Sequence, residues 1–292
     1  MAHSVGDTDQ RNLVAQKAHL TYDPAWRPPQ DPARSGLGPW LAGRLPAPVS
    51  RAVRKAMRFR QSWRDYRDGW LFDLFEREYR TEGLEFEVPR NHTRLRDRAR
   101  FRTDTHESHE RRLIKEYLPA DGSVLELGAC LGVVSCVVNR LLVDRTRHVA
   151  VEPNRELIPV LTRNRDRNAA SFHIVQALVS GHSKGAFYVA DCPTTSSADK
   201  ASGRMVQVPV VTVPQLEATH GLRFDTLVMD IQGGERAFFL ENPEVLERCR
   251  CVILEQHPHI IGPEGAEEVR ARLRAGGLHR IATSGLVEAW RR

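Results

Sequence analysis

The feature that most constrains this chain is a glycine turn that follows a short apolar strand. Residues 124–127 are strand-forming, and the segment runs on as Glu126-x-Gly128-x-x-x-Gly132 before apolar residues return at helical spacing. This pattern predicts a strand, a tight turn and the start of a helix. Glycine lets other atoms approach the backbone closely, and a helix N-terminus offers unpaired N–H groups. The turn is therefore a candidate ligand site.

An acidic residue ends the next apolar segment. His148-Val149-Ala150-Val151 is predicted to be a strand, and Glu152 follows it about 20 residues beyond the turn. A carboxylate at this place can accept hydrogen bonds from both hydroxyls of a ribose. The two successive strand ends therefore predict a nucleoside site.

The spacing of the glycines narrows the kind of nucleoside. Dinucleotide folds usually carry Gly-x-Gly-x-x-Gly, which brings the backbone against a pyrophosphate. Here Gly128 and Gly132 are separated by three residues, and Cys130 stands in place of a further glycine. The form Glu-x-Gly-x-x-x-Gly resembles the first motif of S-adenosylmethionine-dependent methyltransferases. The alternatives are a nicotinamide oxidoreductase and a purely structural turn in an unrelated α/β protein.

From residue 105 onward, predicted strands alternate with predicted helices, among them single strands over 172–179 and 206–211. This alternation favours an α/β class fold with a Rossmann-like, doubly wound, mainly parallel sheet. Ligands of such sheets lie beyond the C-terminal ends of the strands. Four acidic residues are predicted at such ends: Glu126, Glu152, Asp230 and Glu255. We expect them to converge on one site in a domain spanning residues 101–292.

Residues 1–100 form an N-terminal extension in this interpretation. Residues 1–48 are rich in proline, glycine and charge, which predicts irregular structure. From Ser50 to about Tyr79 the pattern predicts an amphipathic helix. Its apolar residues are Val53, Met57, Trp63, Tyr66 and Trp70, and its basic residues include Arg51, Arg54, Lys55 and Arg58. Aromatic stripes usually mean burial, so we expect a helix packed on the catalytic domain; a membrane or nucleic-acid helix is the alternative.

Composition limits the other function classes. The formal net charge is +6 and the pI about 9.3, which we attribute to overall composition rather than to a nucleic-acid partner. No apolar run reaches the roughly 20 residues that a membrane span needs, and the N-terminus lacks a signal pattern. The five cysteines form no C-x-x-C pair. We therefore expect reduced thiols and a cytoplasmic protein.

A second motif resembles that of a narrower family. Residues 224–235, Phe-Asp-Thr-Leu-Val-Met-Asp-Ile-Gln-Gly-Gly-Glu, resemble the strand-four motif of FkbM-type methyltransferases, usually Asp-hydrophobic-Glu/Gln-Gly-small-Glu. The order of the glycine turn, 151–154, 209–213, this motif and 254–257 is also the family order. The resemblance covers about residues 110–290. The departures are Gln232 for a common Glu, Glu126 for a common Asp and Cys130 for a frequent Asn.

The resemblance implies a class I methyltransferase fold, the cofactor S-adenosylmethionine and a hydroxyl acceptor. We expect the cofactor to be bound by Glu126, Gly128, Ala129, Cys130, Gly132, Val133, Glu152, Pro153, Asn154, Gln176, Ala177 and Asp230. We expect the acceptor to contact Ser196, Ser197, Gln232 and Glu235.

The methyl carbon of this cofactor is already electrophilic, so positioning is the main task of the enzyme. A neutral hydroxyl is a poor nucleophile, and a base helps as the new bond forms. The candidate catalytic residues are Asp230, His257 and Glu255, with Asp230 ranked first because it lies in the more specific motif. Asp230 and Glu255, with Glu235 and His257, could also form a Mg²⁺ site, and the spacing leaves this open.

A histidine- and glutamate-rich segment precedes the glycine turn. His106 and His109, with Glu107 and Glu110, have i, i+3 spacing on a predicted helix. We interpret this segment as a polar helix face or a lid over the cofactor, with a metal site as the alternative.

The sequence thus predicts an O-methyltransferase that acts on a hydroxyl of a sugar or secondary metabolite, with a small-molecule or glycan acceptor. The alternatives are a nucleic-acid-binding methyltransferase, an N-methyltransferase acting on a small molecule, and a non-catalytic scaffold. The identity of the acceptor and the oligomeric state are left open.

Overall fold

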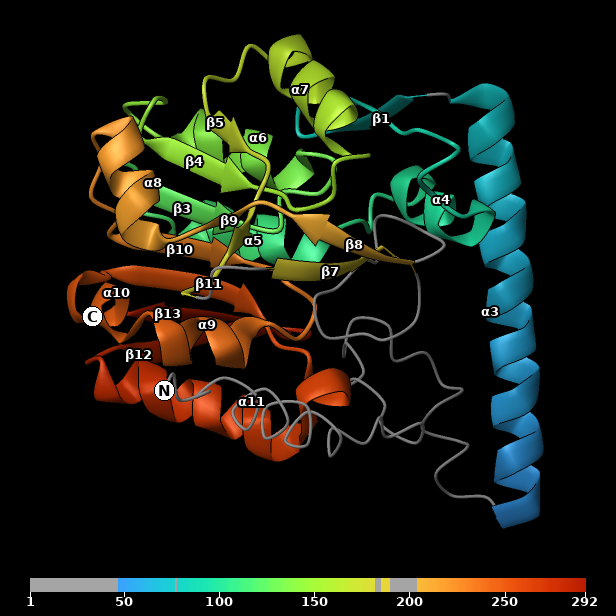
Figure 1. Cartoon of the computed structure of the whole chain (residues 1–292). Helices are drawn as coiled ribbons and strands as arrows, with labels where there is room; N and C mark the ends of the chain where they lie inside the picture. The colour runs from blue at the N-terminus through green and yellow to red at the C-terminus, as the bar shows by residue number, and fades with distance from the viewer. Residues whose placement is uncertain (1–46, 77, 182–184, 190–203) are drawn as a thin grey trace, which may run out of the picture.

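A seven-stranded sheet forms the centre of the chain (Figure 1). The computed structural model describes residues 47–76, 78–181, 185–189 and 204–292. The strands lie in the order β12 (His279–Ser284), β13 (Val287–Arg291), β11 (Cys251–Glu255), β10 (Thr226–Met229), β3 (Val124–Leu127), β4 (His148–Val151) and β5 (His173–Val175). From β11 to β5 all neighbours are parallel, and β13 runs antiparallel to both of its neighbours. The predicted Rossmann-like, mainly parallel sheet is confirmed.

Helices cover both faces of this sheet because alternate strand residues point to opposite sides. In β3, Val124 packs into one hydrophobic cluster, whereas Leu125 and Leu127 pack into the other. The first cluster includes residues of α5 (Ser108–Tyr117), α6 (Val133–Leu141) and α7 (Ile158–Arg167). The second includes residues of α8 (Val213–His220), α9 (Glu235–Glu241), α10 (Pro243–Arg248) and α11 (Pro258–Ala275). The result is a three-layer α/β/α domain.

Two of the predicted strands are wrong in extent. The segment 172–179 divides into β5 and β6 (Leu178–Val179), and 206–211 divides into β8 (Arg204–Val208) and β9 (Val210–Val211). Pro209 separates β8 from β9 because it has no N–H to donate to a ladder. Its carbonyl oxygen accepts the N–H of Leu178 at 2.8 Å, where β6 pairs with β9. β8 pairs separately with β7 (Gly185–Val189).

The long N-terminal helix ends earlier than the sequence predicts. α3 spans Ala47–Phe75, and Tyr79 lies buried in β1 (Glu78–Thr81), which pairs with β2 (Leu84–Glu87). The two residues between these strands, Glu82 and Gly83, both have positive φ, as in the tight turns that suit two-residue hairpins. The sequence analysis missed this hairpin.

Two asparagine side chains, Asn164 of α7 and Asn168 directly after α7, form the hydrogen bonds along β2 that a neighbouring strand would otherwise form. The amide of Asn164 accepts the N–H of Glu87 at 2.7 Å and donates to its carbonyl oxygen at 3.2 Å. Asn168 makes the same pair of bonds to Glu85, at 2.9 and 2.8 Å. Asn164 also donates to the carbonyl oxygen of Leu131 in the glycine turn, at 2.8 Å. The edge of β2 is thereby satisfied, and the hairpin is bound to the catalytic domain.

The three aromatic residues of the predicted stripe, Trp63, Tyr66 and Trp70, are exposed, so their expected burial is wrong. α3 packs through its Gly69 face on α4 (Leu95–Arg102), where a Cβ at Gly69 would overlap the carbonyl oxygen of Leu95. Trp63 and Trp70 lie away from this contact (Figure 1 shows α3 at the edge of the molecule). No described helix is apolar enough over a sufficient length to cross a bilayer.

The ends of β3 and β10 approach each other at Gly128. Its φ is +90°, and an added Cβ would overlap the carbonyl oxygen of Asp230. The sequence suggested that this glycine leaves room for a ligand. In the structure, the space it leaves is taken by the protein's own backbone.

We expect Gly128→Ala to lower the free energy of unfolding by about 2 kcal/mol or more beyond Gly221→Ala. Gly221 is the matched control because its φ is also positive, +65°, but no atom lies within 4 Å of an added Cβ. The control therefore shows the cost of the left-handed backbone alone, about 1–2 kcal/mol. Urea unfolding of both variants measures the difference, and equal losses would contradict the close approach.

Candidate active site

The glycine turn joins the ends of two parallel strands. The N–H groups of Gly128 and Ala129 both donate to the carbonyl oxygen of Val151, at 3.0 and 3.2 Å. Gly132 then closes the turn with φ of +84° and starts α6; its missing Cβ leaves room for Leu161 of α7. The turn is therefore held by backbone contacts at the C-terminal edge of the sheet.

Glu152 lies directly beside this turn. One carboxylate oxygen accepts the N–H of Cys130 at 2.9 Å, and the other accepts the N–H of Asn154 at 2.7 Å. Burial raises the pKa of Glu152 to about 7, against the opposing effect of these two N–H groups. Each oxygen can accept a further hydrogen bond. Glu152 is thus fixed in place and keeps capacity for a donor such as a ribose hydroxyl.

Glu126 is buried beneath the turn rather than open to the strand ends. Its carboxylate accepts the hydroxyl of Ser135 at 2.9 Å and lies 2.8 Å from Nε2 of His148. His148 and Ser135 have no exposed surface, and Glu126 is 2% exposed. A role of Glu126 toward a cofactor would therefore be indirect, through the position of the turn.

Asp230 follows β10 on the other side of the same edge. Its Oδ1 accepts the side-chain N–H of Gln232 at 3.0 Å. Burial raises the pKa of Asp230, and the charge of His257 opposes this rise. Because its backbone carbonyl abuts Gly128, Asp230 lies next to the glycine turn.

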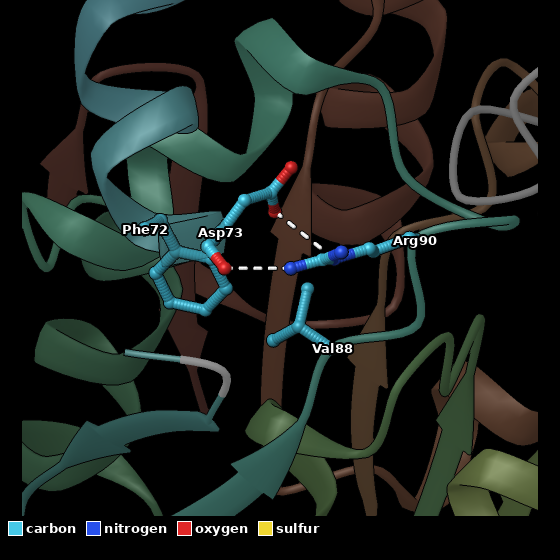
Figure 2. Close-up of a pocket in the computed structure, with 4 residues that line it drawn as sticks. All are labelled: Phe72, Asp73, Val88 and Arg90. Carbon is cyan, nitrogen blue, oxygen red and sulfur yellow. Dashed lines mark hydrogen bonds and ion pairs between the residues drawn. The ribbon is translucent and has the colours of Figure 1, made fainter. Parts of the chain in front are cut away.

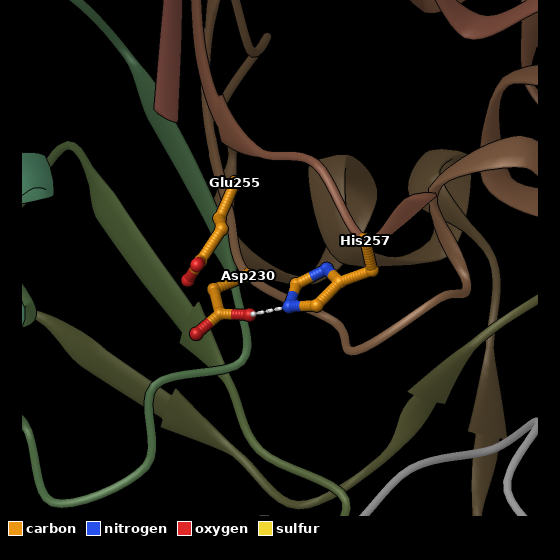
Figure 3. A group of neighbouring side chains, drawn as sticks. All are labelled: Asp230, Glu255 and His257. Carbon is orange, nitrogen blue, oxygen red and sulfur yellow. Dashed lines mark ion pairs between the residues drawn. The ribbon is translucent and has the colours of Figure 1, made fainter. Parts of the chain in front are cut away.

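His257 bridges the carboxylates of Asp230 and Glu235, and Figure 3 shows its contact with Asp230. Its Nε2 lies 3.4 Å from Oδ1 of Asp230, and its Nδ1 lies 2.9 Å from Oε1 of Glu235. Burial lowers the pKa of His257, but the two carboxylates outweigh burial and raise the pKa to about 9. At neutral pH the ring is therefore an imidazolium that donates from both nitrogens.

Glu255 completes this group from the end of β11. Burial, and then the charge of Asp230, raise the pKa of Glu255 to about 8. The environments of Glu255, Asp230 and His257 thus shift the pKa of each group away from its ordinary value, as is common for acids and bases in active sites. At neutral pH we expect Glu255 to hold a proton.

The N-terminal end of α5 brings two further carboxylates to the site, Glu107 and Glu110. Burial raises the pKa of Glu110 well above its usual value, and the charges of Glu255 and Asp230 raise it further. Burial acts to raise the pKa of Glu107, but the charge and hydrogen bond of His106, together with the charge of Arg111, outweigh it and lower the pKa. The sequence left open whether this segment is a polar helix face, a lid over the cofactor or a metal site, and it gave neither glutamate a catalytic or binding role. His109 points elsewhere, with Nδ1 2.6 Å from the hydroxyl of Ser284.

Three site residues have left-handed backbone conformations that are costly for residues other than glycine. Glu107, Cys130 and Gln232 have φ values of 50°, 51° and 51°. Such residues tend to cluster at active sites and binding loops. Here they occur before α5, in the glycine turn and after β10, which are the three segments that surround the strand ends.

Three side chains could together hold a metal ion: Asp230, Glu255 and His257. One ligand atom of each lies within 4.8 Å of the others. The raised pKa of His257 argues against this use, because an imidazolium has no free lone pair for a cation.

The remaining residues predicted for the site have fewer contacts that indicate a direct role. Gln176 and Ala177 follow β5 at the same edge, and Ala177 is buried. Glu235 is fully buried against His257, so its contact with an acceptor would be indirect. Ser196 and Ser197 lie outside the described residues. Val133 and Pro153 border the turn and Glu152.

One buried amide was missed by the sequence analysis. Gln256 stands between Glu255 and His257 and is 1% exposed, yet neither side-chain atom has a hydrogen-bond partner in the described part of the chain. An unpaired buried amide costs about 1–3 kcal/mol. We therefore expect a water or a ligand hydroxyl to satisfy it.

A cavity of about 320 Å³ lies at the C-terminal end of α3, lined by Phe72, Asp73, Val88 and Arg90 (Figure 2). Arg90 donates to the carbonyl oxygen of Asp73 at 2.6 Å. None of these residues belongs to the group at the strand ends. The chemistry therefore points to the strand ends rather than to this cavity.

The chain has low sequence identity to solved methyltransferase structures. No curated protein sequence matches the chain. An FkbM methyltransferase from Methylobacillus flagellatus is 11% identical over 68% of this chain and 54% of its own, with a TM-score of 0.41. An O-methyltransferase from Bacillus cereus, solved with SAH, is 14% identical over 63% of this chain and 80% of its own, with a TM-score of 0.36.

The family assignment rests on a different comparison. The family model described as "Methyltransferase FkbM domain" matches residues 126–278, just over half of the chain. The matched span includes the glycine turn, Glu152 and the Asp230 motif. The chain therefore belongs to the FkbM methyltransferase family and is an S-adenosylmethionine-dependent methyltransferase.

Proposed function

We propose that this methyltransferase transfers the methyl group to a hydroxyl of a sugar or secondary metabolite. The observation that best supports this proposal is the set of pKa shifts among the titratable side chains at the strand ends. A buried carboxylate, Asp230, faces an imidazolium whose pKa is about 9, next to a carboxyl group whose pKa is about 8. This arrangement favours one ionised carboxylate as the base for a hydroxyl proton.

The residues at the strand ends fit the cofactor. Glu152 keeps acceptor capacity for a ribose diol, and its oxygens are held in place by Cys130 and Asn154. Bound S-adenosylmethionine would supply an electrophilic methyl group. The carboxylates that surround the site suit its positively charged sulfonium and ammonium groups.

In the proposed reaction, Asp230 accepts the proton of the acceptor hydroxyl as that oxygen takes the methyl group. His257 positions the Asp230 carboxylate, and its positive charge favours the ionised form by opposing the rise in the pKa of Asp230. Glu235 fixes the His257 ring from the other side. The unpaired amide of Gln256 supports a hydroxyl-rich acceptor or an ordered water nearby.

The other candidate functions have weaker support. A nucleic acid would bring phosphates toward the carboxylate of Asp230, which would repel them. The same carboxylate would attract an amine acceptor, so N-methylation remains the second candidate. Assaying a sugar alcohol against its amino analogue distinguishes the two. A cytoplasmic location stays a prediction.

We expect Glu152→Ala to weaken S-adenosylhomocysteine binding by about 1.5–3 kcal/mol, because a hydrogen bond to a charged group is lost. Isothermal calorimetry measures the change, and thermal unfolding checks that the variant is folded. Glu156→Ala is the matched control, since it removes the same charge from an exposed position nearby. Equal affinities for both variants would remove Glu152 from the cofactor site.

We expect Asp230→Asn to lower kcat by about 10²–10⁴-fold at saturating cofactor, the usual contribution of a general base. His257→Gln should lower kcat less and shift its acidic limb to higher pH, because the charge that opposes the raised pKa of Asp230 is removed. If His257 were the base, wild-type kcat would instead rise as the pH passes through about 9.

The same histidine gives a pH-dependent stability. Because its folded pKa is above its ordinary 6.5, the contribution of His257 is full below about pH 6.5 and is lost as the pH rises through about 9. Unfolding of wild type and His257→Gln at pH 6 and pH 9.5 checks this. A larger difference in unfolding free energy between wild type and His257→Gln at pH 9.5 than at pH 6 would contradict the ion pairs of His257.

We expect activity to be unchanged by a chelator, because His257, one of the three candidate metal ligands, has a raised pKa and is an imidazolium at neutral pH. Rates with EDTA, and with added Mg²⁺, test this. Loss of activity in EDTA that Mg²⁺ restores, and that Glu255→Gln abolishes, would instead make Asp230 and Glu255 metal ligands.

A further inference from the structure

One face of α3 carries a row of exposed apolar side chains. We call this row the aromatic stripe; it consists of Phe59 (65% exposed), Trp63 (65%), Tyr66 (49%), Trp70 (56%) and Leu74 (48%). The spacing of i, i+4, i+7, i+11 and i+15 places these residues on a single helix face. Exposed apolar rows of this kind mark interaction surfaces more often than chance exposure does.

The opposite face of α3 explains why the stripe is turned outward. Gly69 lies against Leu95 at the start of α4, and the buried ring of Phe72 packs beside Phe101 of the same helix. In Figure 1, α3 stands at the edge of the molecule with α4 beside it, and the sheet lies beyond α4. The helix is therefore anchored on one side while the aromatic stripe remains available to a partner.

The charges around the stripe specify an anionic partner. Exposed arginines follow three successive stripe residues directly: Arg60, Arg64 and Arg67. From residue 47 to residue 64 the sequence has six basic residues and no acidic one: Arg51, Arg54, Lys55, Arg58, Arg60 and Arg64. The nearest acids, Asp65 and Asp68, are partly buried, and Asp68 is paired with Arg67. A positive row thus runs beside the aromatic one.

This combination fits a lipid surface better than the other occupants. A helix with aromatic and aliphatic residues on one face, bordered by arginine, lies in the plane of a bilayer interface. Tryptophan and tyrosine suit that boundary because one end of each is apolar and the other polar. Single-stranded nucleic acid stacks on rings set along a groove, whereas this stripe lies on a convex helix. A second copy packed antiparallel on the stripe about a twofold axis would bring the arginine rows of the two copies against each other.

We propose that α3 docks in the plane of an anionic phospholipid bilayer, with the aromatic stripe entering the boundary between headgroups and acyl chains and the arginine row at the phosphates. This surface is separate from the methyl-transfer site, so it does not depend on the proposed acceptor.

Vesicle flotation of the full chain tests the proposal. The vesicles are phosphatidylcholine alone or with one-third phosphatidylglycerol, at low and high salt. We expect binding to the anionic vesicles that weakens with salt. The pair Trp63→Ala and Trp70→Ala, combined, should reduce vesicle affinity at least about tenfold through lost apolar burial. The double variant Arg60→Gln with Arg64→Gln should also reduce the affinity for anionic vesicles about tenfold. This corresponds to about 1.4 kcal/mol of lost electrostatic attraction.

Matched controls change exposed residues elsewhere. Val143→Ala with Ile281→Ala removes exposed apolar groups, and Arg145→Gln with Arg223→Gln removes two exposed positive charges. Both controls should bind like wild type. All variants replace exposed side chains, and far-UV circular dichroism verifies that α3 persists.

Failure of the wild type to float with anionic vesicles would overturn the proposal, as would equal losses in stripe and control variants. A stripe-dependent dimer in sedimentation without vesicle binding would assign the surface to a second copy. Stripe-dependent binding to single-stranded RNA without vesicle binding would assign it to nucleic acid. Each of these results leaves the methyl-transfer assays unaffected.

Discussion

The site depends on the absence of one side chain. Gly128 has no Cβ, so the end of β3 can lie against the backbone carbonyl of Asp230 at the end of β10. The N–H groups of the same turn donate to the carbonyl oxygen of Val151 at the end of β4, directly before Glu152. The ends of three parallel strands therefore lie close together. Glu152 and Asp230 come to the site through these contacts, because each is the first residue after its strand.

Close packing of the strand ends brings several carboxyl groups together, and protonation of some of them reduces the repulsion between their charges. Asp230, Glu255 and Glu110 lie close together, and burial, followed by repulsion from neighbouring carboxylates, raises the pKa of each. His257 is the cation that faces this group from the start of α11, and its pKa is raised in return. Burial and like charge thus produce a mixture of protonated and ionised carboxyl groups, which is what a site that moves protons requires.

The sequence predicted the parts of this site that depend on local patterns. Strand periodicity placed Glu152, Asp230 and Glu255 at the sheet edge, because parallel strands share one C-terminal side. Local patterns say nothing about which helix face meets another element. Trp63 and Trp70 looked like core residues for that reason, and Glu110 looked like a surface residue. The hairpin after α3 was missed because the helical pattern was extended through Tyr79, although the two-residue Glu82-Gly83 turn was a usable signal.

The amide of Asn164 links two distant parts of the chain. It holds the backbone of Glu87 in the N-terminal hairpin and that of Leu131 in the glycine turn with one side chain. The hairpin, which precedes the residues matched by the family model, therefore supports the glycine turn. Removal of the hairpin would take away two of these three hydrogen bonds, so a truncation made just before the family domain would disturb the glycine turn itself.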